Sequence, residues 1–259
     1  MIEVEWNGRR YRSRAAVACD LAIPLSFDGG DPRAFGANVA HADALIAPDF
    51  SGRVATGASC NASVLTITPH GNGTHTESVA HLTDGGPGVP LLLAEGWMPA
   101  WLASVAAESD AIPPEAISDA LADAKTHNCA TFILRTQPND ASKLARHYGK
   151  DNPPAFLALE TAAAIAAADI SHLLVDLPSL DCLDDPALPA HRAFFGLPAG
   201  SRNARDAKRR AATVTEFIYA PDEIADGLYL LDLQVPRWQL EAVPSRPLVI
   251  PAELLQEKE

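Results

Sequence analysis

Apolar runs and segments with helical spacing alternate through the second half of the chain. Residues 130–134 and 172–176 are short aliphatic runs, which are typical of buried strands. Residues 113–125 and 153–168 have prolines near their start and apolar side chains at helical spacing, so two helices are predicted. Residues 227–234 and 247–250 are predicted as late strands. This alternation of helix and strand favours an α/β fold.

The first hundred residues contain fewer regular patterns. Residues 1–11 predict a hairpin that turns at Asn7-Gly8, and residues 63–69 alternate β-branched side chains as a strand does. Trp97 and Trp101 lie four apart and predict a helix with both rings in the core.

The chain contains no internal repeat and no linker long enough to divide it, so one domain covering residues 1–259 is expected. Residues 84–90 are predicted as a loop. Residues 201–210 are predicted as an exposed, mobile insertion, with the basic run 208–210 on a solvated face.

Composition is that of a soluble enzyme. Of 259 residues 47% are hydrophobic and 20% charged, which are globular values. The net charge of -13 argues against a nucleic-acid partner, because the phosphate backbone requires a basic surface. No apolar run reaches the length of a membrane span; the most helix-like, residues 155–170, includes Glu160. We therefore expect neither nucleic acid nor membrane as a partner.

The N-terminus and the cysteines favour a cytoplasmic protein. Residues 1–11 lack the basic and apolar regions of a secretion signal. The four cysteines contain no Cys-x-x-Cys pair, and small buried thiols in a reducing compartment are expected at Cys19, Cys60, Cys129 and Cys182.

The chemistry is concentrated between residues 70 and 81, which contain three of the eight histidines and a carboxylate. Neutral imidazole and carboxylate are ligands that zinc and manganese accept. His75 and Glu77 share one face of an extended segment, and Glu77 and His81 share a face if a helix begins near Thr76. The glycines at positions 71 and 73 let the backbone turn tightly.

Motifs of other hydrolases and nucleotide-binding proteins are absent from the sequence. It contains no Gly-x-Ser-x-Gly nucleophile elbow, no phosphate-binding Gly-x-x-x-x-Gly-Lys loop and no His-Glu-x-x-His helix. Metal-assisted hydrolysis is the chemistry that the remaining residues favour.

The histidine-rich stretch resembles the motif His-x-Gly-Thr-His-x-Asp-x-Pro-x-His of the cyclase-like metal hydrolases, the family of bacterial kynurenine formamidase. Gly73-Thr74-His75, the acid at position 77 and His81 are in register with it. Glu77 stands where the family has Asp, and Val79 where it has Pro. The first histidine of the motif would fall at position 71, one residue after His70, so His70 is either a displaced metal ligand or a donor behind the ligands.

Further segments resemble the family in the same order along the chain. Residues 20–25 resemble its Asp-Leu-Ser-x-Pro segment, residues 132–136 its strand ending in Arg-Thr, and residues 175–181 its Asp-x-Pro-Ser-x-Asp loop. His191 and Glu216 then take the places of two metal-binding residues, although the interval between them is longer than in the typical enzyme. The other four histidines have no motif support and are expected to be structural or exposed: His41, His127, His147 and His172.

The resemblance implies a fold and a function. The fold is an α/β single domain of the swivelling β/β/α type. The function is metal-dependent hydrolysis of a non-peptide C–N bond in a small amide, such as an aryl formamide like N-formylkynurenine or a cyclic amide. His81 is the implied general acid/base. No organic cofactor is implied. One or two zinc or manganese ions are implied, with ligands among His70, His75, Glu77, His191 and Glu216. Members are usually homodimers or homotetramers.

An alternative of a different class stays open at the sequence level. The chain could be a non-catalytic member of the family that binds a small ligand with a weakened or absent metal site. Glu77 in place of Asp and the shifted position of His70 are the two features that favour this alternative.

Overall fold

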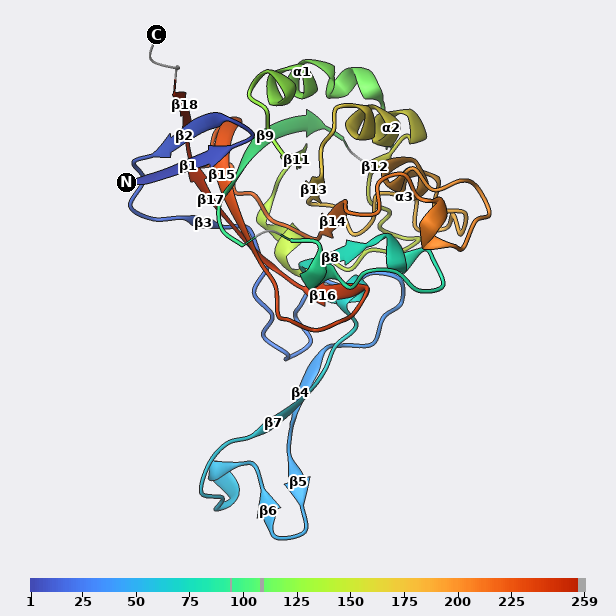
Figure 1. Cartoon of the computed structure of the whole chain (residues 1–259). Coiled ribbons are helices and arrows are strands. Elements are labelled where there is room, and N and C mark those ends of the chain that lie inside the picture. Colours follow the sequence, from blue (N-terminus) through green and yellow to red (C-terminus); the bar gives the residue numbers. More distant parts are fainter. Residues whose placement is uncertain (94, 108–109, 256–259) are drawn as a thin grey trace.

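A nine-stranded sheet that curls over itself forms the body of the protein in the computed structural model, which describes residues 1–93, 95–107 and 110–255 (Figure 1). Its strand order is β16-β8-β14-β13-β11-β9-β15-β17-β3. In chain order the strands are β3 (Cys19–Asp20), β8 (His75–Ser78), β9 (Met98–Ala106), β11 (Thr131–Gln137), β13 (His172–Val175), β14 (Thr213–Glu216), β15 (Gly227–Gln234), β16 (Ala242–Pro244) and β17 (Arg246–Pro251). Strands β9, β11, β13 and β14 are parallel, and the flanking strands are antiparallel.

Three helices cover one face of this sheet (Figure 1): α1 (Ser118–Thr126), α2 (Leu159–Ala167) and α3 (Pro189–Phe195). Alternate residues of β11 pack on opposite faces. Phe132 and Leu134 join the apolar cluster beneath the helices, whereas Ile133 joins the cluster on the other face. Burial on both faces explains why the central strands are continuous apolar runs in the sequence. The predicted α/β class is confirmed.

Both helices expected from the sequence are present but begin later than predicted. The prolines at 113 and 114 lie at the start of a 3-10 turn, η5 (Pro114–Ala116), before α1. Before α2 the chain is extended, because β12 (Phe156–Leu157) pairs in parallel with β10 (Ala111–Ile112). A short strand pairing therefore outweighs the helical spacing of the residues that precede α2.

The predicted helix around Trp97 and Trp101 is wrong. Trp101 lies in the middle of β9, paired with Phe132 and Leu228 of the two neighbouring strands. Nearly every residue of β9 is buried or half-buried, so the strand shows no polar alternation. The four-residue spacing of the two tryptophans therefore does not distinguish a strand from a helix.

The predicted N-terminal hairpin is confirmed. Strand β1 (Ile2–Trp6) pairs with β2 (Arg9–Ser13), and Asn7 and Gly8 between them have φ angles of 47° and 75°. Positive φ at both central residues is typical of a type I′ turn. Strand β18 (Glu253–Leu255) pairs with β2 and completes a small second sheet.

Residues 41–66 form an arm that projects from the body (Figure 1). The arm contains β4 (His41–Ala44) paired with β7 (Ser63–Thr66), β5 (Ile46–Ala47) paired with β6 (Phe50–Ser51), and a 3-10 turn, η1 (Val54–Thr56). Residues 201–210, predicted as an exposed insertion, are mostly exposed, but Arg209 fastens them to α3. Its guanidinium donates to the Phe194 carbonyl at 2.6 Å and stacks 4.6 Å from that ring.

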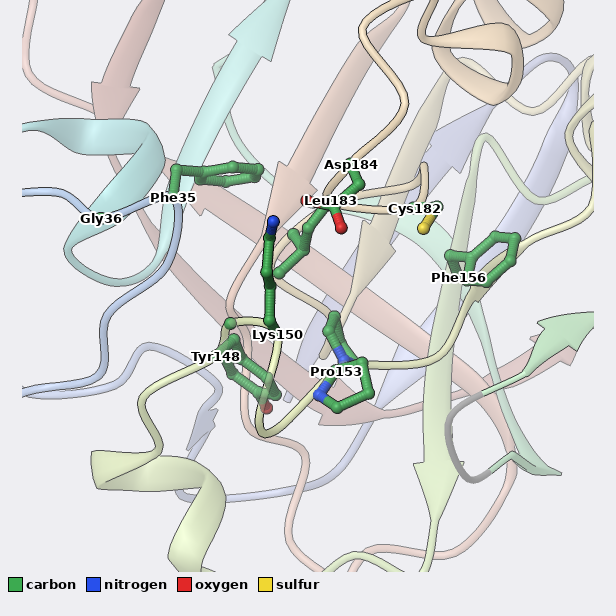
Figure 2. A pocket seen from close by; sticks show the side chains of 11 residues that line it. Phe35, Gly36, Tyr148, Lys150, Pro153, Phe156, Cys182, Leu183 and Asp184 are labelled. Atoms are coloured by element: carbon green, nitrogen blue, oxygen red, sulfur yellow. The ribbon is translucent and has the colours of Figure 1, made fainter.

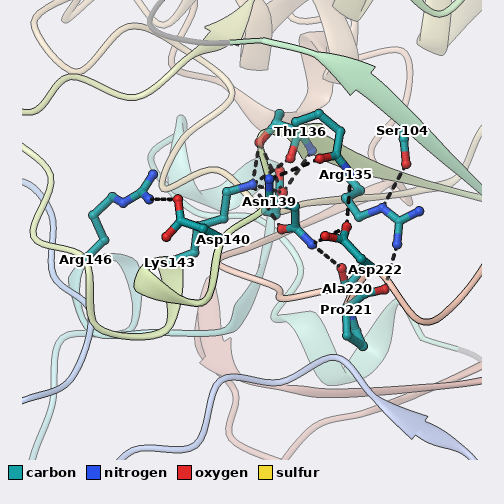
Figure 3. Close-up of polar contacts among 12 residues, drawn as sticks. Ser104, Arg135, Thr136, Asn139, Asp140, Lys143, Arg146, Ala220, Pro221 and Asp222 are labelled. Atoms are coloured by element: carbon teal, nitrogen blue, oxygen red, sulfur yellow. Dashed lines mark hydrogen bonds and ion pairs between the residues drawn. The ribbon is translucent and has the colours of Figure 1, made fainter.

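The segment 132–136, quoted as a family-like strand, is held by two polar networks at its end (Figure 3). Arg135 donates to Ser104 and to the carbonyls of Pro221 and Ile224. Lys143 on η6 (Ala141–Ala145) forms a buried ion pair with Asp176, with Nζ and Oδ2 2.7 Å apart. Asp176 also accepts a hydrogen bond from the Thr136 backbone at 2.9 Å. These contacts tie the carboxyl ends of β11 and β13 together.

The expected burial of all four thiols is wrong. Cys129 is buried and Cys19 half-buried, whereas Cys60 on the arm and Cys182 on a loop are exposed. Within the described residues, no helix has the length and apolar character that crossing a membrane requires.

Candidate metal centre

Strand β8 places His75 and Glu77 on one face of the sheet. It pairs with β14 on one side and β16 on the other, and in this register Glu216 lies directly opposite His75. Residues directly opposite each other in an antiparallel pair project to the same face. His75, Glu77 and Glu216 therefore point to one spot, and His75 Nε2 lies 3.4 Å from Glu216 Oε2.

The helix considered near Thr76 does not form. Thr76 is buried in β8, and its hydroxyl contacts that of Thr215 at 2.8 Å. Pairing on both edges holds the strand extended up to Ser78. A 3-10 turn, η3 (Val79–His81), follows, and Ser78 caps it by accepting from the Ala80 backbone N–H at 3.2 Å. This turn, rather than an α-helix, brings His81 Nε2 to 3.9 Å from Glu77 Oε2.

His191 enters from helix α3 and is held in place by Asp181. The Asp181 carboxylate accepts hydrogen bonds from the backbone N–H groups of Ala190 and His191, and from His191 Nδ1 at 2.6 Å. The other ring nitrogen, Nε2, lies 3.0 Å from Glu77 Oε1 and 3.2 Å from Glu216 Oε1. The backbone N–H of Leu180 also donates a hydrogen bond to Glu216 Oε1, at 3.0 Å.

His70 also reaches the site, from a 3-10 turn, η2 (Pro69–Gly71). Its Nδ1 lies 3.2 Å from Glu77 Oε2, and its Nε2 faces Glu241 Oε1 at 3.6 Å. The turn depends on glycine, because a Cβ on Gly71 would lie 2.3 Å from the Cβ of Ala37. His70 lies one position before the first histidine of the family motif, and its ring nevertheless reaches the site.

The turn after η2 is anchored by the segment 20–25. Gly73 has a φ of 128°, and a Cβ there would lie 2.9 Å from Leu25 Cδ2. The Thr74 hydroxyl accepts from the Ile23 N–H at 2.8 Å and donates to the Phe217 carbonyl. Glycine at 73 and threonine at 74 are therefore both explained by packing that fixes the start of β8.

Hydrogen bonds on the outer side fix the tautomers of two rings. His75 Nδ1 donates to the Gly73 carbonyl at 2.9 Å, and His191 Nδ1 donates to Asp181. In the neutral rings each Nε2 then carries a lone pair directed into the site. This is the arrangement in which histidines bind a metal, with a carbonyl or carboxylate behind the ring.

Several polar atoms at this centre are buried and unpaired, which tests whether a metal fits. Within the described residues, no hydrogen bond reaches Nε2 of His75, Nε2 of His191 or either carboxylate oxygen of Glu77. Leaving such groups unpaired in the interior is costly. One ligand atom each from His70, His75, Glu77 and Glu216 lies within 4.8 Å of the others. The nitrogen and oxygen atoms fit a divalent metal ion.

Mutual electrostatics perturb the buried groups strongly. Burial would raise the pKa of Glu77, but the imidazoles of His81 and His191 hold it well below its ordinary value. Burial would lower the pKa of His191, but Glu77 and the hydrogen bond to Asp181 raise it well above its ordinary value. The buried carboxylates are therefore stabilised by positive charge at the centre. Protons on the imidazole rings or a bound cation can supply that charge.

His81 differs from the other histidines of the centre. Glu77 raises its pKa, but burial together with the rings of His70 and His191 outweighs that effect and leaves the pKa below the ordinary value. The His81 ring lies 4.2 Å from that of His70, centroid to centroid. It also lines the adjoining cavity, so a molecule in the cavity can reach it.

That cavity has a volume of about 390 Å³ and opens on side chains of the candidate metal centre. Its walls are largely apolar, with contributions from Phe35, Leu183 and Leu188. A second cavity of about 580 Å³ shares Phe35 and Leu183 with it (Figure 2). Lys150 points into this second cavity, and Asp184 lies on its opposite wall. A ligand larger than the first cavity therefore has adjoining space.

The structure brings all six predicted site residues together, and their roles as ligands or acid/base stay predictions. They are His70, His75, Glu77, His81, His191 and Glu216. Sequence reasoning gave no role to Asp181 or Glu241, which contact His191 and His70 from behind. Asp181 was visible as the last residue of the segment 175–181, whereas nothing in the sequence pointed to Glu241. The histidines outside the motif include His172, which is buried and bonded to Thr213 at 2.8 Å.

One protein-family profile matches the chain. The profile of the family described as "Putative cyclase" matches residues 19–182, more than half of the chain. No functionally curated protein matches the chain.

Solved structures share the fold at low sequence identity. A predicted metal-dependent hydrolase from Bacillus stearothermophilus is 16% identical, with a TM-score of 0.61, covering 91% of this chain and 98% of its own. Isatin hydrolase A from Labrenzia aggregata is 15% identical, with a TM-score of 0.63 and 93% of each chain covered. Isatin hydrolase A from Ralstonia solanacearum is 13% identical, with a TM-score of 0.60, covering 92% of this chain and 91% of its own.

Proposed function

We propose that this chain, which belongs to the cyclase family, is a metal-dependent hydrolase that cleaves the C–N bond of a small amide. The observation that carries the proposal is the convergence of unpaired, buried nitrogen and oxygen atoms beside an apolar cavity that His81 also lines. Similar structures named as hydrolases support it.

The residues that would hold the ion are His70, His75, Glu77, His191 and Glu216. We propose one or two zinc or manganese ions. A bound ion of this kind polarises a carbonyl and lowers the pKa of water from 15.7 towards about 7. Asp181 and the Gly73 carbonyl hold the rings of His191 and His75 in the tautomer that such binding requires.

The His81 imidazole is the proposed group that moves protons. Its Nε2 would take a proton from the attacking water and return it to the departing nitrogen. The lowered pKa keeps the ring neutral near pH 7, as a proton acceptor must be. Help of this kind is worth roughly 10²–10⁴ in rate. The apolar walls around Phe35 and Leu188 would position an aromatic or aliphatic group next to the ring.

We propose two substrate types for this largely apolar cavity of about 390 Å³: an aryl formamide like N-formylkynurenine, and a cyclic amide. The cyclic amide is supported by the two similar structures named isatin hydrolase, because isatin is a cyclic amide fused to an aromatic ring. As further parts of the proposal, the protein is placed in the cytoplasm and assembles as a homo-oligomer.

A substrate screen tests the proposal. Protein freed of metal and then loaded with zinc or manganese is incubated with aryl formamides, cyclic amides and lactones, and product is followed by absorbance and mass spectrometry. We expect turnover of at least one amide class, dependent on added metal and lost in His75→Ala. Protein that takes up neither metal, measured by elemental analysis, contradicts the proposal and supports a metal-free binding protein. Metal uptake without turnover of any amide contradicts the proposed reaction.

A further inference from the structure

Two histidine rings of the candidate metal centre are held from behind at Nδ1. His75 Nδ1 donates to the Gly73 carbonyl at 2.9 Å, and His191 Nδ1 donates to the Asp181 carboxylate at 2.6 Å. An acceptor that faces one nitrogen of a neutral ring leaves the lone pair on the other nitrogen. Both rings therefore present Nε2 to the centre.

The ring of His70 is turned the other way round. Its Nδ1 lies at the centre, 3.2 Å from Glu77 Oε2, and its Nε2 lies 3.6 Å from Glu241 Oε1. In the part of the chain that the structure describes, this Nε2 is buried and has no hydrogen-bond partner. Leaving it unpaired is costly, and the Glu241 carboxylate is placed to accept from it. The Glu241 side chain is 43% exposed, so it has room for the small movement that a hydrogen bond requires.

The backbone is fixed on both sides of this contact. Glu241 directly precedes β16, and its carbonyl accepts from the Ser78 N–H at 2.9 Å. His70 lies in η2, where the carbonyl of Gly71 accepts from the Ala34 N–H at 3.1 Å. The approach of the two side chains is therefore set by the fold around β8 and η2.

Two carboxylates select one orientation of the His70 ring. Turning the ring over about its Cβ–Cγ bond would exchange each nitrogen for a carbon. Carbon atoms would then face both Glu77 and Glu241, and both polar contacts would be lost. The rings of His75 and His81 pack beside His70, with centroids 5.0 and 4.2 Å away, and limit other rotations.

This orientation accounts for the position of His70 in the sequence. The first histidine of the family motif would fall at position 71, where this chain has glycine. In any histidine Nδ1 is bonded to Cγ, whereas Nε2 lies on the far side of the ring. A histidine that binds through Nδ1 therefore keeps its backbone closer to the ion. A histidine shifted by one residue can reach the same centre by presenting the nearer nitrogen.

We propose that His70 binds the metal ion through Nδ1, whereas His75 and His191 bind through Nε2, and that Glu241 positions the His70 ring for this role. Glu241 accepts from the Nε2–H group and so keeps the lone pair on Nδ1. It is a positioning residue that acts through His70. The proposal rests on the metal centre of the proposed function and is independent of which bond is cleaved.

Metal affinity of two Glu241 variants tests the positioning role. Glu241→Ala removes the acceptor, whereas Glu241→Gln keeps a carbonyl oxygen that accepts from Nε2–H. Both remove the charge. We expect zinc affinity, measured by competition with a chelating dye, to fall by about 10–100-fold in Glu241→Ala and to be largely retained in Glu241→Gln. Glu115→Ala, at an exposed position on η5, is the control and should bind zinc as the parent does. Circular dichroism verifies that the variants fold.

Nuclear magnetic resonance identifies the nitrogen that binds. In protein with isotope-labelled histidine and with cadmium as the bound metal, a ligating nitrogen shows a coupling to cadmium. We expect this coupling at Nδ1 of His70 and at Nε2 of His75 and His191.

Two variants of His70 make the same comparison without labelling. The side-chain oxygen of asparagine can occupy the place of Nδ1, and the longer side chain of glutamine brings its oxygen to the place of Nε2. His70→Asn should therefore retain more zinc affinity than His70→Gln.

Four results would overturn the proposal. Coupling to cadmium at Nε2 of His70, or tighter zinc binding in His70→Gln than in His70→Asn, shows that the ring binds the other way round. Unchanged affinity in Glu241→Ala shows that Glu241 does not position the ring. Equal losses in both Glu241 variants show that its charge acts and not its hydrogen bond. These results leave the proposed function intact, whereas a parent that takes up no metal overturns both.

Discussion

Asp181 contacts His191 twice: its carboxylate accepts from the His191 backbone N–H at 3.1 Å and from the ring Nδ1 at 2.6 Å. The first contact fixes where the residue sits at the start of α3, and the second fixes the ring and its tautomer. The two residues therefore act as one unit that presents Nε2 to Glu77 and Glu216.

Replacing the carboxylate tests this unit. Asp181→Asn replaces one carboxylate oxygen with an NH₂ group. If the remaining oxygen still accepts from the Ala190 N–H, the NH₂ group faces His191 Nδ1. The ring must then expose an N–H to the site instead of a lone pair. We expect metal affinity to fall by about 10–100-fold, the usual effect of losing such a partner. Competition with a chelating dye measures the affinity, and Asp151→Asn, at an exposed position, should leave it unchanged.

The role of His81 separates from metal binding. Its Nε2 lies 3.9 Å from Glu77, farther than the ring nitrogens of His70 and His191. In His81→Ala we expect metal content close to that of the parent and turnover lower by roughly 10²–10⁴. Elemental analysis and steady-state rates on the same preparation check both parts. An equal loss of metal would make His81 a ligand and not the proton-transfer group.

Glu77 in place of the family's Asp is expected to be adapted to this site. Its two oxygens reach His191 at 3.0 Å and His70 at 3.2 Å, on opposite sides. Glu77→Asp withdraws the carboxylate by about 1.5 Å, one carbon–carbon bond. Zinc–oxygen bonds are near 2.0–2.2 Å with little tolerance, so metal affinity and turnover should both fall. A variant that binds metal more tightly and turns over faster would show that Glu77 weakens the site.

The buried ring of His172 predicts a loss of stability in acid. Burial, helped by Arg209, lowers the pKa of His172 to about 4. The unfolded chain binds a proton at this residue below about pH 6.5, whereas the folded protein does so only near pH 4. The unfolded state therefore holds more protons in this window, and stability, complete above about pH 6.5, is lost as the pH falls towards 4.

Substituting the ring removes that contribution. As the pH falls from 7 to 4, the parent should lose about 3 kcal/mol more of its free energy of unfolding than His172→Gln does, because glutamine does not titrate. Denaturant unfolding at several pH values measures the difference. A difference that is constant with pH would show that His172 does not titrate between the two states.

The sequence determined the elements whose patterns are local. The hairpin at Asn7-Gly8, the strands around residues 131–137 and 227–234, and the cores of α1 and α2 follow from turn chemistry and periodicity. Side-chain spacing along one strand also placed His75 and Glu77 on a common face. Glu216 and His191 were named through ordered resemblance rather than periodicity, because a lone carboxylate on a strand or a lone histidine on a helix has no local signature.

Tertiary structure decided the rest. Pairing of β8 on both edges kept Thr76 extended, against the helix that residues 77 and 81 allowed. Burial of β9 on both faces removed the alternation that would have separated the strand around Trp101 from a helix. Glu241 contacts His70, although the two residues are 171 positions apart, and no pattern in the sequence indicates that contact. The physical reason is common to all three: strand pairing, two-sided burial and contact between distant segments depend on neighbours in space, whereas periodicity and turn chemistry report only neighbours along the chain.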